Sequence, residues 1–350
     1  MPTIDENKKH LTALFSGDFA GHALIVSPPG ILGLPADQSI GDEPLASRLD
    51  RVVAAYENAV RFQEAVDDDT VPFANIHTST AIFAASFGCD VVEFEGSNPA
   101  SRPLIETAAE ADAIKVPNIW DTVLGRHLEF AAAVRDRVGP DVPVSGPDMQ
   151  SPLGLAAQIW EKASFMQAMI DTPEAVEGLI VKCHELLKTY LTELRQILPN
   201  HNPIHCPLLW APKELGCSVS EDEVGAISRG MYEEFALWTL IDLSETFGGL
   251  FMHCCAAADH QYPAFKKIPN LRGLNRVFQA PGPEPALRAF GDKTVHMVAW
   301  RTIDDIKREY LDANVPGVRF AFCMSAETVD EARRTLATLR EWCSIATALR

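Results

Sequence analysis

A histidine and a cysteine separated by one residue, His253 and Cys255, end an apolar run of the chain. The run, Gly248 to Met252, has the composition of a buried strand. Because alternate side chains of a strand share a face, the imidazole and the Cys255 thiol are expected to point the same way, and Cys254 the opposite way. A histidine nitrogen and a thiolate on one face can bind zinc and leave a coordination position free for chemistry.

These two ligands need a scaffold that brings a third one from elsewhere in the chain. Short apolar runs that alternate with segments of helical period predict such a scaffold. The candidate strands are residues 72–77, 90–94, 142–146, 204–210, 250–254, 271–276, 294–300 and 318–322. The candidate helices are residues 80–87, 104–114, 127–138, 173–198, 221–247, 286–290, 303–311 and 326–349. Strands and helices in this alternation predict an α/β fold, a single (β/α)8 TIM barrel.

The residues ahead of the first candidate strand form an extension. A barrel of this class needs about 250 residues, which residues 71–350 supply. Residues 1–70 contain the apolar run 23–27, a turn rich in Pro and Gly, and a helix predicted over 44–66. We expect this segment to pack on the barrel as a cap or dimer element.

Active sites of such barrels form where the carboxyl ends of the strands converge. His253 and Cys255 end the fifth candidate strand, and Cys323 ends the eighth, so the barrel supplies Cys323 as the natural third metal ligand. Taken alone, a buried cysteine such as Cys323 or Cys254 is as readily a small apolar side chain.

Other polar or aromatic residues also lie at the ends of the candidate strands. His77, Glu93 and Glu95 are candidates for acid or base catalysis. Candidates for substrate binding are Asn75, Asp148, Gln150, Trp210, Asn275, Arg276 and Trp300. For each of them, ordinary loop packing with local hydrogen bonds is the alternative. His201 and His205 have helical spacing, but Pro203 between them disfavours a helical zinc pair.

The composition excludes several classes of function. The chain has 350 residues, is 47% hydrophobic and carries a formal charge of −18 without any cluster of Lys and Arg, which disfavours nucleic-acid binding. The sequence contains neither an apolar run long enough for a membrane span nor the pattern of a secretory signal. Its eight cysteines are spread along the chain, which favours reduced thiols and a cytoplasmic protein.

Several of these motifs together resemble a known family. His253-x-Cys255, the later Cys323, the segment beginning Tyr232-Glu-Glu-Phe-Ala, and the segment Gly146-Pro-Asp-Met-Gln-Ser-Pro-Leu-Gly are similar to the uroporphyrinogen decarboxylase superfamily. The likeness extends from about residue 23 to the carboxyl end. Within the superfamily, the chain resembles the zinc-containing, corrinoid-dependent methyltransferases of the methylcobalamin:coenzyme M type.

This resemblance implies a zinc ion that binds a substrate thiol, which exchanges a methyl group with a corrinoid such as methylcobalamin. Zinc lowers the pKa of a coordinated thiol and so supplies a nucleophile at neutral pH. The corrinoid is expected on a separate protein, with a small molecule as the second substrate, and the enzyme is expected to be a monomer or homodimer. The direction of transfer and the choice between Cys254 and Cys255 stay open.

Two other functions fit the same residues. One is a metal-free lyase of the decarboxylase type, in which Arg276 or Arg301 holds a substrate carboxylate and the cysteines are structural. Porphyrinogen decarboxylation itself is disfavoured, because the Arg-rich amino-terminal signature is missing and the first arginine is Arg48. The other is a noncatalytic barrel that binds a corrinoid or a tetrapyrrole.

Overall fold

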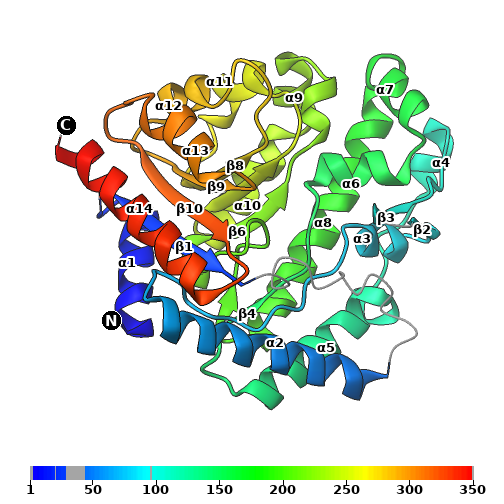
Figure 1. Cartoon of the computed structure of the whole chain (residues 1–350). Helices are drawn as coiled ribbons and strands as arrows, with labels where there is room; N and C mark the ends of the chain where they lie inside the picture. Colours follow the sequence, from blue (N-terminus) through cyan, green and yellow to red (C-terminus); the bar gives the residue numbers. More distant parts are fainter. Residues whose placement is uncertain (1–2, 20, 29–43, 95–96, 349–350) are drawn as a thin grey trace.

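A computed structural model describes residues 3–19, 21–28, 44–94 and 97–348 of the chain. Its main element is a parallel sheet with the strand order β1-β10-β9-β8-β7-β6 (Figure 1). The strands are β1 (His22–Ser27), β6 (Cys217–Ser220), β7 (Leu250–Cys254), β8 (Leu271–Arg276), β9 (Val295–Ala299) and β10 (Arg319–Ser325). The predicted strands 250–254 and 271–276 are confirmed with their bounds, and the last two are confirmed to within a few residues.

Helices surround this sheet. They are α1 (Ile4–Ser16), α2 (Leu45–Val66), α3 (Ala81–Ser86), α4 (Ala108–Ala113), α5 (Val123–Val138), α6 (Pro152–Ile159), α7 (Lys162–Asp171), α8 (Pro173–Ile197), α9 (Arg229–Phe235), α10 (Leu237–Phe247), α11 (Tyr262–Phe265), α12 (Glu284–Phe290), α13 (Ile303–Asp305) and α14 (Val329–Ala348). In Figure 1, α11 to α14 lie to the left and α3 and α6 to α8 to the right. Among the described residues, none of the helices is apolar over a length that would span a bilayer.

The predicted barrel strands that lie outside this sheet form only in part. β4 (Val144–Ser145) pairs in parallel with β5 (His201–Asn202), and isolated bridges join Ala74 to Val144 and Gln150 to Ser220. The α/β class is therefore confirmed, but the described residues form a six-stranded sheet and two separate two-stranded sheets rather than a continuous eight-stranded ladder.

Side chains take the place of a strand ladder beside β1. The Asp69 carboxylate accepts a hydrogen bond from the Leu24 backbone N–H at 2.7 Å, and the Asp68 carboxylate accepts one from Val26 N–H at 2.6 Å. Backbone donors that a neighbouring strand would satisfy are thus satisfied by carboxylates. β1, which comes from the predicted extension, pairs with β10 along its length, so the extension contributes a strand to the sheet.

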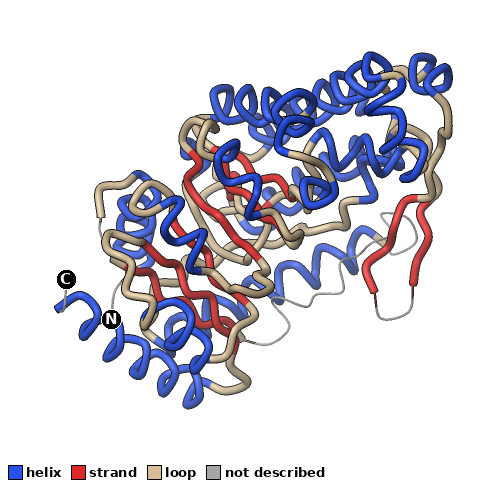
Figure 2. The backbone as a smooth tube through the Cα atoms, turned by 90° about the horizontal axis from the view of Figure 1, so that it is seen from above, coloured by secondary structure: helices blue, strands red, loops and turns tan. Residues whose placement is uncertain are grey.

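Two predicted barrel strands are wrong, and a third, residues 72–77, forms only the single bridge at Ala74. Residues 90–94 form β2 (Val91–Phe94), which pairs only with β3 (Ser97–Ser101) in an antiparallel hairpin that extends away from the main sheet (Figure 2). Residues 204–210 are irregular, and β6 at 217–220 is the strand of the sheet instead. Pro203 and Pro207 lack the N–H that a central strand must donate, which explains the second error.

Strand β7 is buried on both faces, as parallel strands are. Phe251 packs in one apolar cluster with Trp210, Met297 and Cys323, whereas Met252 and Cys254 belong to the larger cluster that includes helix α8. The alternation expected along this strand is confirmed. His253 therefore follows the face of Phe251, and Cys254 faces the other way.

The turn into β7 requires glycine, which leads to a first prediction. Gly248 ends α10 with φ +97°, and a Cβ on it would overlap the Glu214 carbonyl oxygen. We expect Gly248→Ala to lower the free energy of unfolding by about 1–3 kcal/mol, through backbone strain and this overlap. Gly178→Ala is the matched control, because Gly178 lies within α8 with open space around it; it should stabilise the helix by about 0.5–1 kcal/mol. Urea unfolding of both variants tests the difference, and equal effects would refute it.

Candidate metal centre

Three potential metal ligands meet at the carboxyl ends of two neighbouring strands. The ligand atoms of Asp222, His253 and Cys255 all lie within 4.8 Å of one another. Parallel pairing of β6 with β7 sets this arrangement, because Ser220 is the register partner of His253 and Asp222 follows two residues later. The imidazole Nε2 lies 2.8 Å from Cys255 Sγ, and the Cys255 backbone N–H donates to Asp222 Oδ1 at 2.6 Å.

A buried asparagine fixes the orientation of the His253 ring. Asn275 is the register partner of His253 on β8, and its Nδ2 donates to the Met297 carbonyl oxygen at 2.6 Å. Its Oδ1 is therefore the acceptor that lies 2.6 Å from His253 Nδ1. The proton of the neutral ring is thus held on Nδ1, which leaves the lone pair of Nε2 directed at the Cys255 sulfur. Metal-binding histidines are oriented in the same way.

The Cys255 thiol needs a cation beside it to ionise. Burial raises the pKa of Cys255 to about 11, and the carboxylates of Asp222 and Asp148 add to the increase. A divalent cation at this place would reverse that effect by stabilising the thiolate directly. Nitrogen, sulfur and carboxylate oxygen are all zinc ligands, and Cys255 is solvent-exposed, so a bound ion would have an open side. The residues present therefore fit a zinc ion with room for a small ligand.

The predicted third ligand, Cys323, is not a member of this group. It lies on β10 within the apolar cluster of Phe251 and Trp210, and its thiol contacts the Ala321 carbonyl oxygen at 3.9 Å. Burial raises its pKa to about 12. Metal binding by Cys323 stays a prediction, and Asp222 is the residue that the described geometry adds.

A second thiol lies behind the imidazole. Cys206 Sγ is 3.4 Å from His253 Nδ1 and 3.9 Å from Asn275 Oδ1. Burial holds the pKa of Cys206 well above its ordinary value, and the carboxylate of Asp148 adds to this. Cys206 is therefore a neutral thiol that packs against the buried edge of the ring.

A polar cluster lies beside Asp222, His253 and Cys255, which together are called the metal group from this point on. The Ser220 hydroxyl donates to Asp148 Oδ1 at 2.9 Å, and His205 Nε2 lies 3.1 Å from the same oxygen and 3.0 Å from Ser220 Oγ. Burial alone would raise the pKa of Asp148, but the His205 imidazole, His77 and the Ser220 hydrogen bond outweigh it and hold that pKa well below its usual range. Asp148 is thus a carboxylate surrounded by groups that can hold a proton.

Two of the predicted polar residues, Gln150 and His77, lie next to Asp222 and Asp148. Gln150 Nε2 donates to Asp222 Oδ2 at 3.4 Å, which places the amide next to the metal group. His77 lies near Asp148, and burial lowers its pKa, so it is neutral. Asn75 instead makes local bonds, since its Oδ1 accepts from Ser145 Oγ and from the His77 backbone N–H.

Two further predicted residues lie close to the metal group. The Trp300 ring is 55% exposed, and its centroid is 6.0 Å from that of His253 in an edge-on contact. Arg276 is almost fully buried, and its Nη2 donates to the Ala256 carbonyl oxygen at 2.7 Å, next to Cys255. Trp300 can therefore contact a ligand on the metal, whereas Arg276 supports the loop that carries Cys255.

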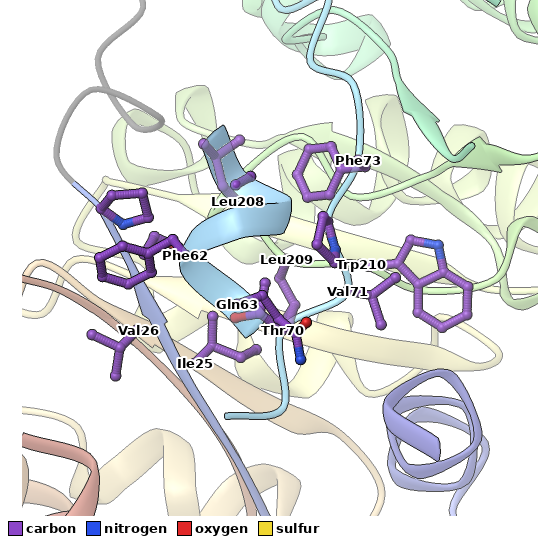
Figure 3. Close-up of a pocket in the computed structure, with 14 residues that line it drawn as sticks. Ile25, Val26, Phe62, Gln63, Thr70, Val71, Phe73, Leu208, Leu209 and Trp210 are labelled. Atoms are coloured by element: carbon purple, nitrogen blue, oxygen red, sulfur yellow. The ribbon is translucent and has the colours of Figure 1, made fainter. Parts of the chain in front are cut away.

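The remaining predicted residues lie elsewhere. Trp210 lines an apolar cavity with Ile25, Val71 and Phe73, and its ring is buried there rather than exposed to a substrate (Figure 3). Glu93 is exposed on the β2–β3 hairpin, outside the parallel sheet. Glu95 lies outside the described residues. Catalysis by Glu93 and Glu95 stays a prediction, and the exposed position of Glu93 on the hairpin does not support it for that residue.

Sequence reasoning missed Asp222, Ser220 and the role of His205. Ser220 to Glu223 has the pattern of a capping box, which predicts a helix start, but the Ser220 hydroxyl bonds Asp148 and His205 instead. The available signal was the short run Cys217 to Ser220, because recognising it as a strand would have placed Asp222 at a carboxyl end.

A buried carboxyl next to Asp222 gives a prediction about pH. Burial raises the pKa of Glu221 to about 8 from 4.5, and the hydrogen bond from Ser151 only partly offsets this. Because the folded pKa is the higher one, the stabilising contribution is complete below pH 4.5 and is lost as pH rises to about 8. Between pH 6 and 8.5, the wild type should lose about 2–3 kcal/mol more unfolding free energy than Glu221→Gln.

Urea unfolding at the two pH values measures this, with Glu185→Gln, an exposed site on α8, as the control. Parallel losses in all three proteins would contradict the expected result.

Comparisons with known proteins agree with part of this description. The uroporphyrinogen decarboxylase (URO-D) family model matches residues 66–197, in agreement with the predicted superfamily, and this match ends before the metal group. A methyltransferase from Methanosarcina mazei aligns with a TM-score of 0.67 at 14% identity, covering 96% of this chain and 98% of that chain, and thus shares the fold. The oxidized form of the homocysteine methyltransferase MmuM from Escherichia coli aligns over 68% of this chain and 96% of that chain at 12% identity, with a TM-score of 0.29 that is too low to indicate a common fold. No curated protein matches the chain.

Proposed function

We propose that this chain, a member of the uroporphyrinogen decarboxylase superfamily, is a zinc-dependent methyltransferase that moves a methyl group between a corrinoid and a small thiol. The observation that carries the proposal is the group of Asp222, His253 and Cys255, with the exposed side of Cys255 open to a ligand. In this proposal the six strands of the sheet and the β4–β5 pair are parts of one (β/α)8 barrel, and the group lies at its mouth. The fold shared with a methyltransferase supports the choice of reaction class.

Some residues of the site would bind the zinc ion, and others would accept the proton of the substrate thiol. A bound zinc ion supplies a Lewis acid that lowers the pKa of the substrate thiol. His253 Nε2, Cys255 Sγ and an Asp222 oxygen would hold the ion, while Asn275 would keep the His253 proton on Nδ1. The Asp148–His205 pair, next to Gln150 and Asp222, can receive the thiol proton.

The methyl transfer needs no external oxidant or reductant. In the direction of thiol methylation, the thiol sulfur would take the methyl group, and the electron pair of the cobalt–carbon bond would stay on the corrinoid. The thiol proton leaves to the Asp148–His205 pair or to water. A separate corrinoid-carrying protein would bring its cofactor to the mouth, where Trp300 is the exposed aromatic side chain nearest to His253.

Methylcobalamin and a panel of small thiols test this function directly. The wild type should consume methylcobalamin in the presence of at least one thiol, followed as the loss of its absorbance. A chelator should stop the reaction, and added zinc should restore it. Corrinoid binding without turnover would favour the noncatalytic alternative, and release of CO2 from a carboxylated substrate by metal-free protein would favour the lyase. Either result would refute the proposal.

A further inference from the structure

A basic cavity lies at the opposite end of the sheet from the metal group. It has a volume of about 610 Å³ and opens at the amino ends of β8, β9 and β10, next to the end of α1 and to helices α11 and α12. Its basic lining side chains are Lys266, Arg272, Arg288, Lys293 and Arg319. Its volume is within the range of sites for small organic ligands.

The charge of this cavity is opposite to that of the whole protein. The chain carries −18 overall with 30 Lys and Arg residues, yet five of these cations line this one cavity beside a single carboxylate, Asp292. Arg288 shares its charge with Glu284 at 2.6 Å on the exposed surface of α12. Cations brought together in this way repel one another unless an anion lies between them.

Two of the arginines have hydrogen-bonding capacity left over. Arg319 is only 4% exposed, and its guanidinium donates to the carbonyl oxygens of Leu14 and Asp292, but its buried Nε has no partner among the described residues. Arg272 Nη2 donates to the Gly248 carbonyl oxygen, and its buried Nε likewise lacks a partner among them. Both Nε atoms are buried, and an unpaired buried donor is costly, whereas charge-assisted bonds from guanidinium groups to phosphate oxygens are strong.

The guanidinium groups of Arg272 and Arg319 lie close enough to affect a pKa. Burial lowers the pKa of Arg319; Asp292 opposes this, and Arg272 lowers the pKa further. Burial also lowers the pKa of Arg272, and Asp18 opposes this change. An anion bound between the two guanidinium groups would relieve their mutual repulsion.

The lining also has an apolar part. Phe265, Ile268 and Phe290 belong to the lining next to the basic side chains; Phe265 is fully buried, and Ile268 and Phe290 expose 4% and 5% of their surface. A ligand that matches both features carries several negative charges at one end and an apolar or ring-shaped group at the other. A monocarboxylate would leave most of the positive charge uncompensated.

We propose that this basic cavity binds a small phosphate-bearing molecule, with the phosphates between Arg272 and Arg319 and near the two exposed lysines, and the apolar part against Phe290. The site is separate from the metal group, because the cavity lies at the amino ends of β8 to β10, whereas the metal group lies at the carboxyl ends of β6 and β7, at the other end of the parallel sheet. Its function does not depend on methyl transfer.

Inorganic pyrophosphate is the probe for a first test by isothermal titration calorimetry at 0.15 M salt. The wild type should bind with a dissociation constant below about 1 mM, and Lys266→Gln combined with Lys293→Gln should weaken binding by about tenfold or more, because two charge-assisted contacts are lost. Both lysines are exposed, so the double variant should fold. Arg272 and Arg319 are left unchanged, since both hold backbone carbonyl oxygens in place.

Two controls make the result specific. Lys115→Gln removes one lysine charge from an exposed position after α4 and should bind pyrophosphate as the wild type does. Cys255→Ser should also keep pyrophosphate binding, which separates this site from the metal group. The proposal is overturned if the wild type does not bind pyrophosphate, if the lysine variant binds it unchanged, or if Lys115→Gln weakens binding equally.

Discussion

Replacing Cys255 with serine should remove the metal from the protein. The wild type, purified without chelator, should carry about one zinc per chain, and Cys255→Ser should bind zinc at least about 100-fold more weakly, because a serine hydroxyl stays protonated where a thiol becomes a thiolate ligand. The structure motivates this expectation, since Cys255 Sγ lies 2.8 Å from His253 Nε2. Elemental analysis by mass spectrometry and zinc titration against a fluorescent chelator measure the content and the affinity.

The neighbouring thiol supplies the matched control. Cys254 is fully buried, faces the larger apolar cluster and lies 3.9 Å from the Ala256 carbonyl oxygen. Cys254→Ser should therefore keep its zinc, although it should be less stable than the wild type. If Cys254→Ser loses the metal and Cys255→Ser retains it, then Cys254 is the metal ligand and Cys255 is not. If both variants retain it, the site does not use this pair.

Asn275→Leu should weaken zinc binding by about 10–100-fold without removing any ligand. The asparagine Oδ1 accepts the proton of His253 Nδ1 at 2.6 Å and so keeps the Nε2 lone pair directed at the site. Leucine offers no acceptor, so the ring can exchange its proton between the two nitrogens and rotate. Zinc affinity is the measurement, together with the absorption spectrum of the cobalt(II)-substituted protein, which reports the ligand geometry.

Asn275→Asp separates this effect from general damage to the fold. Both variants lose the hydrogen bond that Nδ2 donates to the Met297 carbonyl oxygen, but aspartate keeps an acceptor for His253 Nδ1. We therefore expect Asn275→Asp to bind zinc more tightly than Asn275→Leu. Equal losses in the two variants would mean that packing around residue 275, and not the orientation of the imidazole, controls the site.

The central part of the site could be predicted because its geometry is local. The alternation of side chains along β7 needs only the strand itself, and the apolar run Gly248 to Met252 specifies that strand. It follows that His253 and Cys255 share a face and Cys254 does not. Asn275 was found for a similar reason, since it ends an apolar run that forms β8 with the predicted bounds.

Other parts of the fold depend on partners that a sequence pattern does not reveal. β4 and β5 have two residues each, and the carboxylates of Asp68 and Asp69 replace a ladder beside β1. Such segments are extended because of their neighbours, not because of their composition. Asp222 was missed for this reason, as its place in the metal group comes from the pairing of β6 with β7.

X-ray absorption at the zinc edge tests the central claim most directly, because it reports the atoms bound to the ion. We expect zinc–nitrogen or zinc–oxygen distances near 2.0 Å and at least one zinc–sulfur distance near 2.3 Å, with the sulfur signal reduced in Cys255→Ser. One sulfur in the wild type would agree with Asp222 as the third ligand, and two would require a second thiolate, from Cys323 or from Cys206. A protein that binds no zinc, or a zinc shell without sulfur, would contradict the account.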